Sequence, residues 1–346
     1  MENRPKSGYH SSELKLLDNI IDSILNKTNI PGASMAVCFK ERLVYERGHG
    51  YSKLNGNDTI AIQYNAVFRI ASISKTITAT TIMHLVERQK LALDDKIYNI
   101  LKTDLSEIEI TDDRIKDITI KDLLGHTGGW NRNISGDPGF NVLRMSVAMG
   151  DNPPGSELAV IRYMMGLPLD YTPGSQQVYS NFGYMILGRV IEIITGKPYE
   201  AYVLNQILRP NGITTMEIGA IVEDNLQENE VFYHDSRVYP SVLRGGGAVQ
   251  APFGAFNLKA MKAHGGWVSS ASDLLRFITA VYGKSYRKDI LLPESIQSMT
   301  RPLGNFKTMI HNTAWDGKYK TRTMNQSGFT GATFQALRPF SSIKAI

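Results

Sequence analysis

An extended apolar run at positions 66–71 leads directly into a helical stretch at 76–89, and the junction between them is Ser72-Ile73-Ser74-Lys75. The helix begins without charge beyond Lys75, so we expect Ser72 to be at least half buried. If both residues lie on the first turn, they share one face and the lysine ammonium can touch the serine hydroxyl.

This pairing has a chemical meaning. A serine hydroxyl is a weak nucleophile at neutral pH and needs a neighbouring base to remove its proton. The partial positive charge of a helix N-terminus favours a neutral Lys75 that can act as that base. The junction therefore predicts a serine nucleophile activated by a lysine.

The spacing alone is not specific, because Ser-x-x-Lys occurs four times in the chain. The serines Ser12, Ser285 and Ser341 begin the other three copies, and all three lie in polar segments that we expect at the surface. Only Ser72 stands between an apolar strand-like run and the long uncharged start of a helix.

Composition limits the class of protein. The chain has 346 residues, of which 42% are hydrophobic and 21% charged, as in an ordinary globular protein of one large domain or two subdomains. The net charge of +5 comes from scattered lysines and arginines, so no nucleic-acid partner is expected. The single cysteine, Cys38, excludes an intrachain disulfide, and the seven histidines lack metal-ligand spacing. We expect no metal and no cofactor.

Targeting signals are also missing from the sequence. Residues 1–12 are polar and carry no apolar core of a signal peptide, and no stretch reaches the roughly 18 apolar residues of a membrane span. We expect a cytoplasmic protein, or a secreted or periplasmic one if a leader has been removed.

The periodicity places strands at both ends of the chain and helices in the middle. Strands are expected at 33–39 and 43–47, at 267–268 and at 324–337, with a loop at 48–65. Helices are expected at 14–26, 118–124, 180–195, 200–207 and 273–282, the last with Ser272 as its N-cap. This order predicts an α/β (α+β) fold in which both ends complete one sheet around a helical insert.

Tyr179-Ser180-Asn181 is the second chemically informative stretch. A tyrosine hydroxyl can relay a proton, and an asparagine amide can hold a substrate carbonyl. The alternative is structural, with Tyr179 a half-buried aromatic residue and Ser180 or Asn181 a helix N-cap. No G-x-S-x-G elbow or H-E-x-x-H motif is present, and we expect His126 to stabilise a turn rather than act as a base.

Three ordered motifs give the chain a family resemblance. Ser72-Ile73-Ser74-Lys75, Tyr179-Ser180-Asn181 and Gln326-Ser327-Gly328 resemble the motifs of class C β-lactamases and penicillin-binding-protein-like serine hydrolases. Residues 118–129, 171–188 and 264–274 resemble further stretches of the same family, and the match covers roughly residues 14–340.

The resemblance implies a β-lactamase/transpeptidase-like fold over residues 12–346. An antiparallel sheet flanked by helices would come from about 12–70 and 262–346, and a mainly helical part from about 71–261, with the active site in the cleft between them. Ser72 would form an acyl-enzyme, Lys75 and Tyr179 would share the proton, and backbone N–H groups of Ser72 and Phe329 would hold the oxyanion. The residues implied for substrate binding are Asn181, Gln326, Ser327, Gly328 and Phe329.

Two features depart from the family pattern. The third motif usually begins with lysine or histidine, whereas Gln326 brings no positive charge for a substrate carboxylate. The family also continues beyond the third motif with a strand and a terminal helix, which we expect to be missing from this sequence. We therefore expect an uncovered sheet edge through which the protein can self-associate.

The resulting functional hypothesis is a serine hydrolase for a small-molecule or peptide substrate. It would cleave an ester, amide or peptide bond, as an esterase, a D-amino-acid peptidase or a β-lactamase-like enzyme. The alternative is a catalytically impaired penicillin-binding or scaffold member of the same fold.

Overall fold

The computed structural model describes residues 4–55, 58–282, 289–300 and the backbone of 329–336. The predicted substrate-binding residues Gln326, Ser327 and Gly328 therefore lie outside the described residues. Most of the residues after the third motif also lie outside the described residues, so the expected lack of the family's terminal strand and helix falls outside them as well.

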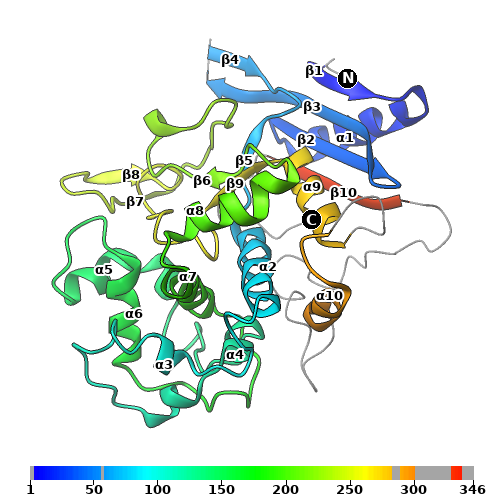
Figure 1. The fold of residues 1–346 in the computed structure, drawn as a ribbon. Helices are drawn as coiled ribbons and strands as arrows, with labels where there is room; N and C mark the ends of the chain where they lie inside the picture. The colour runs from blue at the N-terminus through cyan, green and yellow to red at the C-terminus, as the bar shows by residue number, and fades with distance from the viewer. Residues whose placement is uncertain (1–3, 56–57, 283–288, 301–328, 337–346) are drawn as a thin grey trace.

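The described elements follow the order that the sequence pattern predicts, with strands near both ends and most of the helices between them (Figure 1). The strands are β1 (Lys6–His10), β2 (Gly32–Phe39), β3 (Arg42–Asn55), β4 (Asp58–Ala61), β5 (Val67–Arg69), β6 (Glu217–Ile218), β7 (Val238–Pro240), β8 (Ala248–Gln250), β9 (Trp267–Ser270) and β10 (Phe329–Ala336). The α-helices are α1 (Lys15–Thr28), α2 (Ser74–Glu87), α3 (Ile97–Ile100), α4 (Ile120–Leu124), α5 (Val142–Ala148), α6 (Glu157–Met165), α7 (Asn181–Thr195), α8 (Tyr199–Val203), α9 (Ala271–Tyr282) and α10 (Pro293–Thr300).

The main sheet joins the two ends of the chain. Its strands are antiparallel in the order β1-β3-β2-β10, and β4 pairs with the far end of β3. Alternate residues of β2 point to opposite faces. Ala33 and Val37 pack with Ile21 and Leu25 of α1, whereas Ala36 packs with Ala271 and Leu275 of α9. The sheet therefore lies between α1 and α9.

A second, smaller sheet, β5-β9-β6, connects the main sheet to the helical part of the molecule. From it, α2 runs through the centre of the helices and packs against α7 (Figure 1). Every residue of α2 from Ser74 to Leu85 is buried, because apart from Lys75 its side chains are uncharged and many of them are small, which allows close packing on all sides. Some of its polar side chains have partners inside, since the Thr78 hydroxyl donates to the Ala263 carbonyl at 2.6 Å, whereas the buried hydroxyls of Thr76 and Thr80 have no hydrogen-bond partner among the described residues.

The expected loop at 48–65 is wrong, since β3 extends to Asn55 and β4 pairs with it. The polar segment before α1 also forms a strand, β1, with Lys6 opposite His49. Gly48 and Gly50 permit these contacts: a Cβ on Gly48 would lie 2.8 Å from the Gln63 carbonyl oxygen, and Gly50 has a φ of +83°. The polar residues and glycines of these segments lack the alternation of apolar and polar side chains by which a strand is predicted from sequence.

The start of the last long helix differs by two residues from the prediction. Helix α9 begins at Ala271, and the Ser270 hydroxyl, rather than that of Ser272, accepts from the Asp273 N–H at 3.2 Å. The predicted cap of the helix after Tyr179 is confirmed, because the Ser180 hydroxyl accepts from the Gly183 N–H at 3.1 Å.

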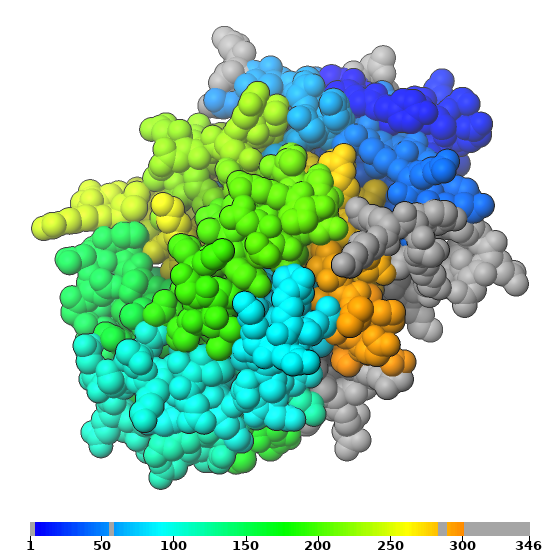
Figure 2. Space-filling view, viewed as in Figure 1, coloured from blue at the N-terminus to red at the C-terminus, as the bar shows by residue number. Residues whose placement is uncertain are grey.

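The space-filling view shows the sheet side, in blue, above the helical part in cyan and green, with the yellow β7–β8 hairpin projecting from one side (Figure 2). Across the described ranges, none of the helices has both the length and the apolar character needed to cross a bilayer.

Candidate active site

Ser72 lies where the small sheet meets the helices. Strand β5 ends at Arg69, a short 3₁₀ turn (Ala71–Ile73) carries Ser72, and α2 begins at Ser74. Ala71 has a φ of +46°, in the left-handed region that alanine rarely occupies. Such backbone strain persists only where the surrounding structure imposes it, and it occurs often at functional sites. Here the strained residue directly precedes Ser72, whose side chain is half buried.

Three side chains meet at this turn. The Ser72 hydroxyl lies 2.6 Å from the Tyr179 hydroxyl, and the Lys75 ammonium lies 3.2 Å from Ser72 Oγ and 2.6 Å from Tyr179 Oη. Lys75 also donates to the backbone carbonyl of His264 at 2.8 Å. The structure thus brings together Ser72, Lys75 and Tyr179, the three residues that the sequence pattern predicts as catalytic.

The environment of Lys75 favours its neutral form. The side chain is completely buried, and this desolvation lowers its pKa from the ordinary value, against the opposing effect of Tyr179. Buried lysines with lowered pKa values are suited to accept a proton. A proton leaving Ser72 Oγ can therefore pass to Lys75 or to Tyr179 within hydrogen-bond distance.

His126 holds the segment that carries Tyr179. Its carbonyl accepts from the Val178 N–H at 2.9 Å, and its Nδ1 accepts from the Ser180 N–H at 3.2 Å. The residues on both sides of Tyr179 are thereby tied to one histidine. Burial, followed by the charge of Lys75, lowers the pKa of His126 to about 3, so the ring is neutral and Nδ1 is free to accept.

The loop before β9 fixes the far side of Lys75. Its His264 and Ala263 carbonyls accept from Lys75 and from Thr78, both on α2. Lys262 anchors the same loop to the helices by pairing with Glu157 of α6 at 2.9 Å and Glu192 of α7 at 2.6 Å. The loop is closely packed, since a Cβ on Gly266 would lie 2.5 Å from the Leu258 carbonyl.

Asn181, predicted to bind substrate, begins α7 and is buried. Its amide nitrogen donates to Asp137 Oδ2 at 2.7 Å, and the Gly139 N–H donates to Asp137 Oδ1 at 3.1 Å. A carboxylate only accepts, so Asp137 fixes the orientation of the Asn181 amide. Asp137 was not predicted, because nothing in its own loop marks it as a partner of a residue 44 positions away.

The remaining predicted residue, Phe329, opens β10, where its backbone pairs with Phe39 of β2. The main-chain oxygen of His264 was not predicted either. The stretch His264-Gly265-Gly266-Trp267 stood out in the sequence, but a carbonyl contact with a lysine 189 residues away leaves no signal of residue type.

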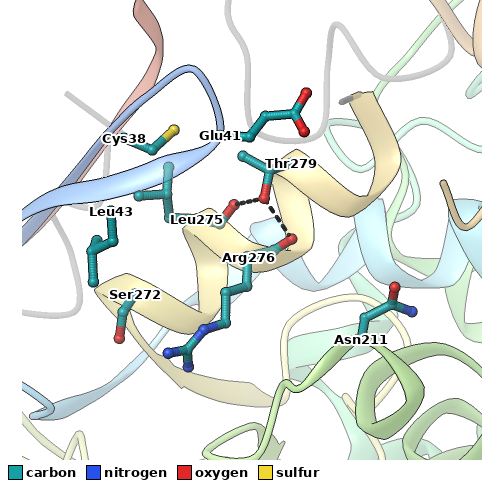
Figure 3. A pocket seen from close by; sticks show the side chains of 8 residues that line it. All are labelled: Cys38, Glu41, Leu43, Asn211, Ser272, Leu275, Arg276 and Thr279. Carbon is teal, nitrogen blue, oxygen red and sulfur yellow. Dashed lines mark hydrogen bonds between the residues drawn. The ribbon is translucent and has the colours of Figure 1, made fainter. Parts of the chain in front are cut away.

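A separate hollow of about 370 Å³ lies between α9 and the β2–β3 turn. Figure 3 shows Cys38 and Leu43 on one side of it and Arg276 and Thr279 on the other, with the Thr279 hydroxyl donating to carbonyls of α9. It contains none of the three predicted catalytic residues. In the parts of the chain that the structure covers, no group of three or more His, Cys, Asp or Glu residues could hold a metal ion.

The fold and the meeting of a serine, a lysine and a tyrosine at the start of a buried helix together define a β-lactamase/transpeptidase-like protein. The family model described as Beta-lactamase matches residues 17–334. The chain belongs to the β-lactamase family of serine hydrolases.

Similar proteins within this family carry different names. Esterase EstB of Burkholderia gladioli is 28% identical over 298 residues, which cover 82% of this chain and 73% of that protein. A putative D-alanyl-D-alanine carboxypeptidase of Escherichia coli O157:H7 is 27% identical over 215 residues, which cover 60% of this chain and 48% of the relative. The chain thus matches about half the length of the latter.

Solved structures confirm the fold. The D-amino acid amidase of Ochrobactrum anthropi SV3 superposes with a TM-score of 0.63 and 21% identity, covering 84% of this chain and 76% of that one. The octameric penicillin-binding protein homologue of Pyrococcus abyssi gives 0.62 and 24%, covering 84% and 60%.

Proposed function

We propose that the protein is a serine acyl hydrolase that cleaves ester or amide bonds of small substrates through an acyl-enzyme on Ser72. The observation that carries the proposal is the contact of Ser72 Oγ with both Tyr179 Oη and a buried Lys75. A serine becomes an effective nucleophile when its hydroxyl proton is transferred to an adjacent base.

The reaction follows in two halves. Ser72 Oγ attacks the carbonyl carbon and its proton passes to Lys75 Nζ or Tyr179 Oη. The tetrahedral intermediate expels the leaving group, which takes up that proton, and leaves an acyl-serine. Water then attacks the acyl carbonyl by the same proton relay in reverse and releases the acid.

Two backbone N–H groups, of Ser72 and of Phe329, are proposed to stabilise the oxyanion. Such a donor is typically worth about 3 kcal/mol in the transition state. Asn181, Gln326, Ser327 and Gly328 are proposed to contact the substrate. The names of the relatives support esters, D-amino acid amides and D-alanyl peptides as the substrate classes to test first.

The test is intact mass spectrometry after incubation with a fluorophosphonate, a short p-nitrophenyl ester and a penicillin. We expect one adduct per chain on the wild type and none on Ser72→Ala. The reagent whose adduct is hydrolysed, so that the free enzyme is regenerated, identifies the substrate class. Absence of any adduct on folded wild-type protein would refute the hydrolase and favour a catalytically impaired binding member of the family.

Self-association is proposed as well, through the edge of β10. Within the described ranges this strand pairs only with β2 and ends the strand order. An open strand edge offers backbone groups to another chain. Sedimentation equilibrium measures the mass of the protein in solution over a range of concentrations. A monomer at all concentrations would refute self-association.

A further inference from the structure

Arg132 carries a positive charge beside the three site residues. It lies on the turn after Trp130, is exposed, and its guanidinium carbon is 5.1 Å from the centroid of the Tyr179 ring. Lys75 Nζ lies 4.7 Å from the same centroid. Arg132 therefore stands next to the phenol whose hydroxyl contacts Ser72.

The turn that bears Arg132 is anchored on both sides. Asp170 Oδ2 accepts from the Asn131 N–H at 2.6 Å and from the Ser135 hydroxyl at 2.8 Å. The Ile134 and Ser135 N–H groups close the turn on the Asn131 carbonyl. These hydrogen bonds fix the backbone of the turn, and they thereby fix the position from which the Arg132 side chain extends.

The charge of Arg132 is uncompensated within the described residues. Several arginines pair with carboxylates, as Arg189 does with Asp104 at 2.6 Å, whereas Arg132 forms no hydrogen bond or ion pair with a described residue. Asp137, the carboxylate at this site, already accepts from Asn181 and Gly139. Both carboxylate oxygens of Asp137 thus accept hydrogen bonds inside the protein, whereas the Arg132 guanidinium remains available to a ligand.

This charge acts on the site. Burial is the main cause that lowers the pKa of Lys75 and of His126, and the positive charge of Arg132 adds a small effect in the same direction. A guanidinium presents several N–H donors in a planar fork that matches a carboxylate. The chain as a whole is also basic, with a net charge of +5, which attracts anions.

We propose that Arg132 is a specificity-determining residue that binds a carboxylate of the substrate, so that the enzyme prefers anionic acyl compounds to neutral ones. The inference rests on the proposed acyl-hydrolase function and names its substrate class.

The kinetic test compares two esters that differ by one charge, p-nitrophenyl hydrogen adipate and its methyl ester. We expect the ratio of their kcat/KM values to favour the free acid in the wild type and to fall about tenfold in Arg132→Gln, because a charge-assisted hydrogen bond is lost. Arg132→Lys, which keeps the charge but not the fork, gives an intermediate ratio. Arg144→Gln, which removes an exposed arginine on α5, leaves the ratio unchanged.

An equal effect of Arg132→Gln on both esters would overturn the proposal, as would no effect on either. Because Arg132 contacts the Tyr179 ring, only the ratio between the two esters, and not either rate alone, reports substrate charge. A preference that persists at high salt in Arg132→Gln would assign the anion to another residue.

A binding measurement separates this proposal from the hydrolase itself. In Ser72→Ala, which cannot be acylated, NMR titration with monomethyl adipate and with dimethyl adipate measures anion recognition without turnover. We expect the monoanion to bind more tightly, and Arg132→Gln to weaken its binding about tenfold. Equal affinities for the two compounds would refute the anion site even if Ser72 is the nucleophile.

Discussion

Lys75 is a buried amine with three oxygen neighbours: Ser72 Oγ, Tyr179 Oη and the His264 carbonyl. Burial favours its neutral form, and the oxygens hold the amine against the nucleophile. The same residue thus has a structural and a chemical role, which substitution can separate.

We predict that Lys75→Met lowers the rate of Ser72 acylation by about a hundred- to ten-thousand-fold, the usual contribution of a positioned proton acceptor. Methionine keeps most of the apolar stem and its packing, so the far-UV circular dichroism should match that of the wild type. Labelling by a fluorophosphonate, followed over time by intact mass, measures the rate. Unchanged labelling would remove the lysine from the mechanism.

The helix α7 shows how an element positions the site. Its N-cap Ser180 satisfies the Gly183 N–H and directly follows Tyr179, while His126 ties down the residues on both sides of the tyrosine. Helix α4 has an equivalent cap at Thr119, whose hydroxyl accepts from the Asp122 N–H at 3.1 Å, and it lies outside the group of three site residues.

We predict that Ser180→Ala and Thr119→Ala each lower the free energy of unfolding by about 1 kcal/mol, the typical value of an N-cap. Only Ser180→Ala should also lower kcat, because it loosens the segment that carries Tyr179. Urea denaturation and ester kinetics on both variants provide the measurement. An equal loss of kcat in Thr119→Ala would show that the cap acts through overall stability.

At the scale of elements, the sequence predicted those helices and strands whose side-chain pattern carries a local signal. The α7 helix, its Ser180 cap and the β2 strand were expected because apolar periodicity and capping residues are local signals. Strand β1 and the extension of β3 were not, since their polar residues and glycines match a loop and only pairing makes them strands. The roles of Asp137 and of the His264 carbonyl could not be predicted from the sequence either, because both contacts join segments that are far apart in the chain.

Considered as a whole, the molecule buries several ionisable groups in its helical part. His84 on α2 is 4% exposed, and burial, followed by the charges of Arg88 and Lys90, lowers its pKa to about 4. A histidine with an unfolded-state pKa near 6.5 therefore binds a proton more readily in the unfolded chain. Its contribution to stability is complete above about pH 6.5 and decreases as the pH falls toward 4.

We predict that the wild type loses stability as the pH is lowered over this range and that His84→Met removes part of the loss. For one histidine the difference between the pH profiles should approach about 3 kcal/mol at pH 4, from 1.36 kcal/mol per pKa unit. His126, whose pKa is lowered to about 3, adds a similar loss that continues to lower pH and remains in the variant. Free energies of unfolding from urea titrations between about pH 7 and pH 4 test this. Parallel profiles for wild type and His84→Met would show that His84 is solvated more than its burial indicates, and that acid instability of the molecule arises elsewhere.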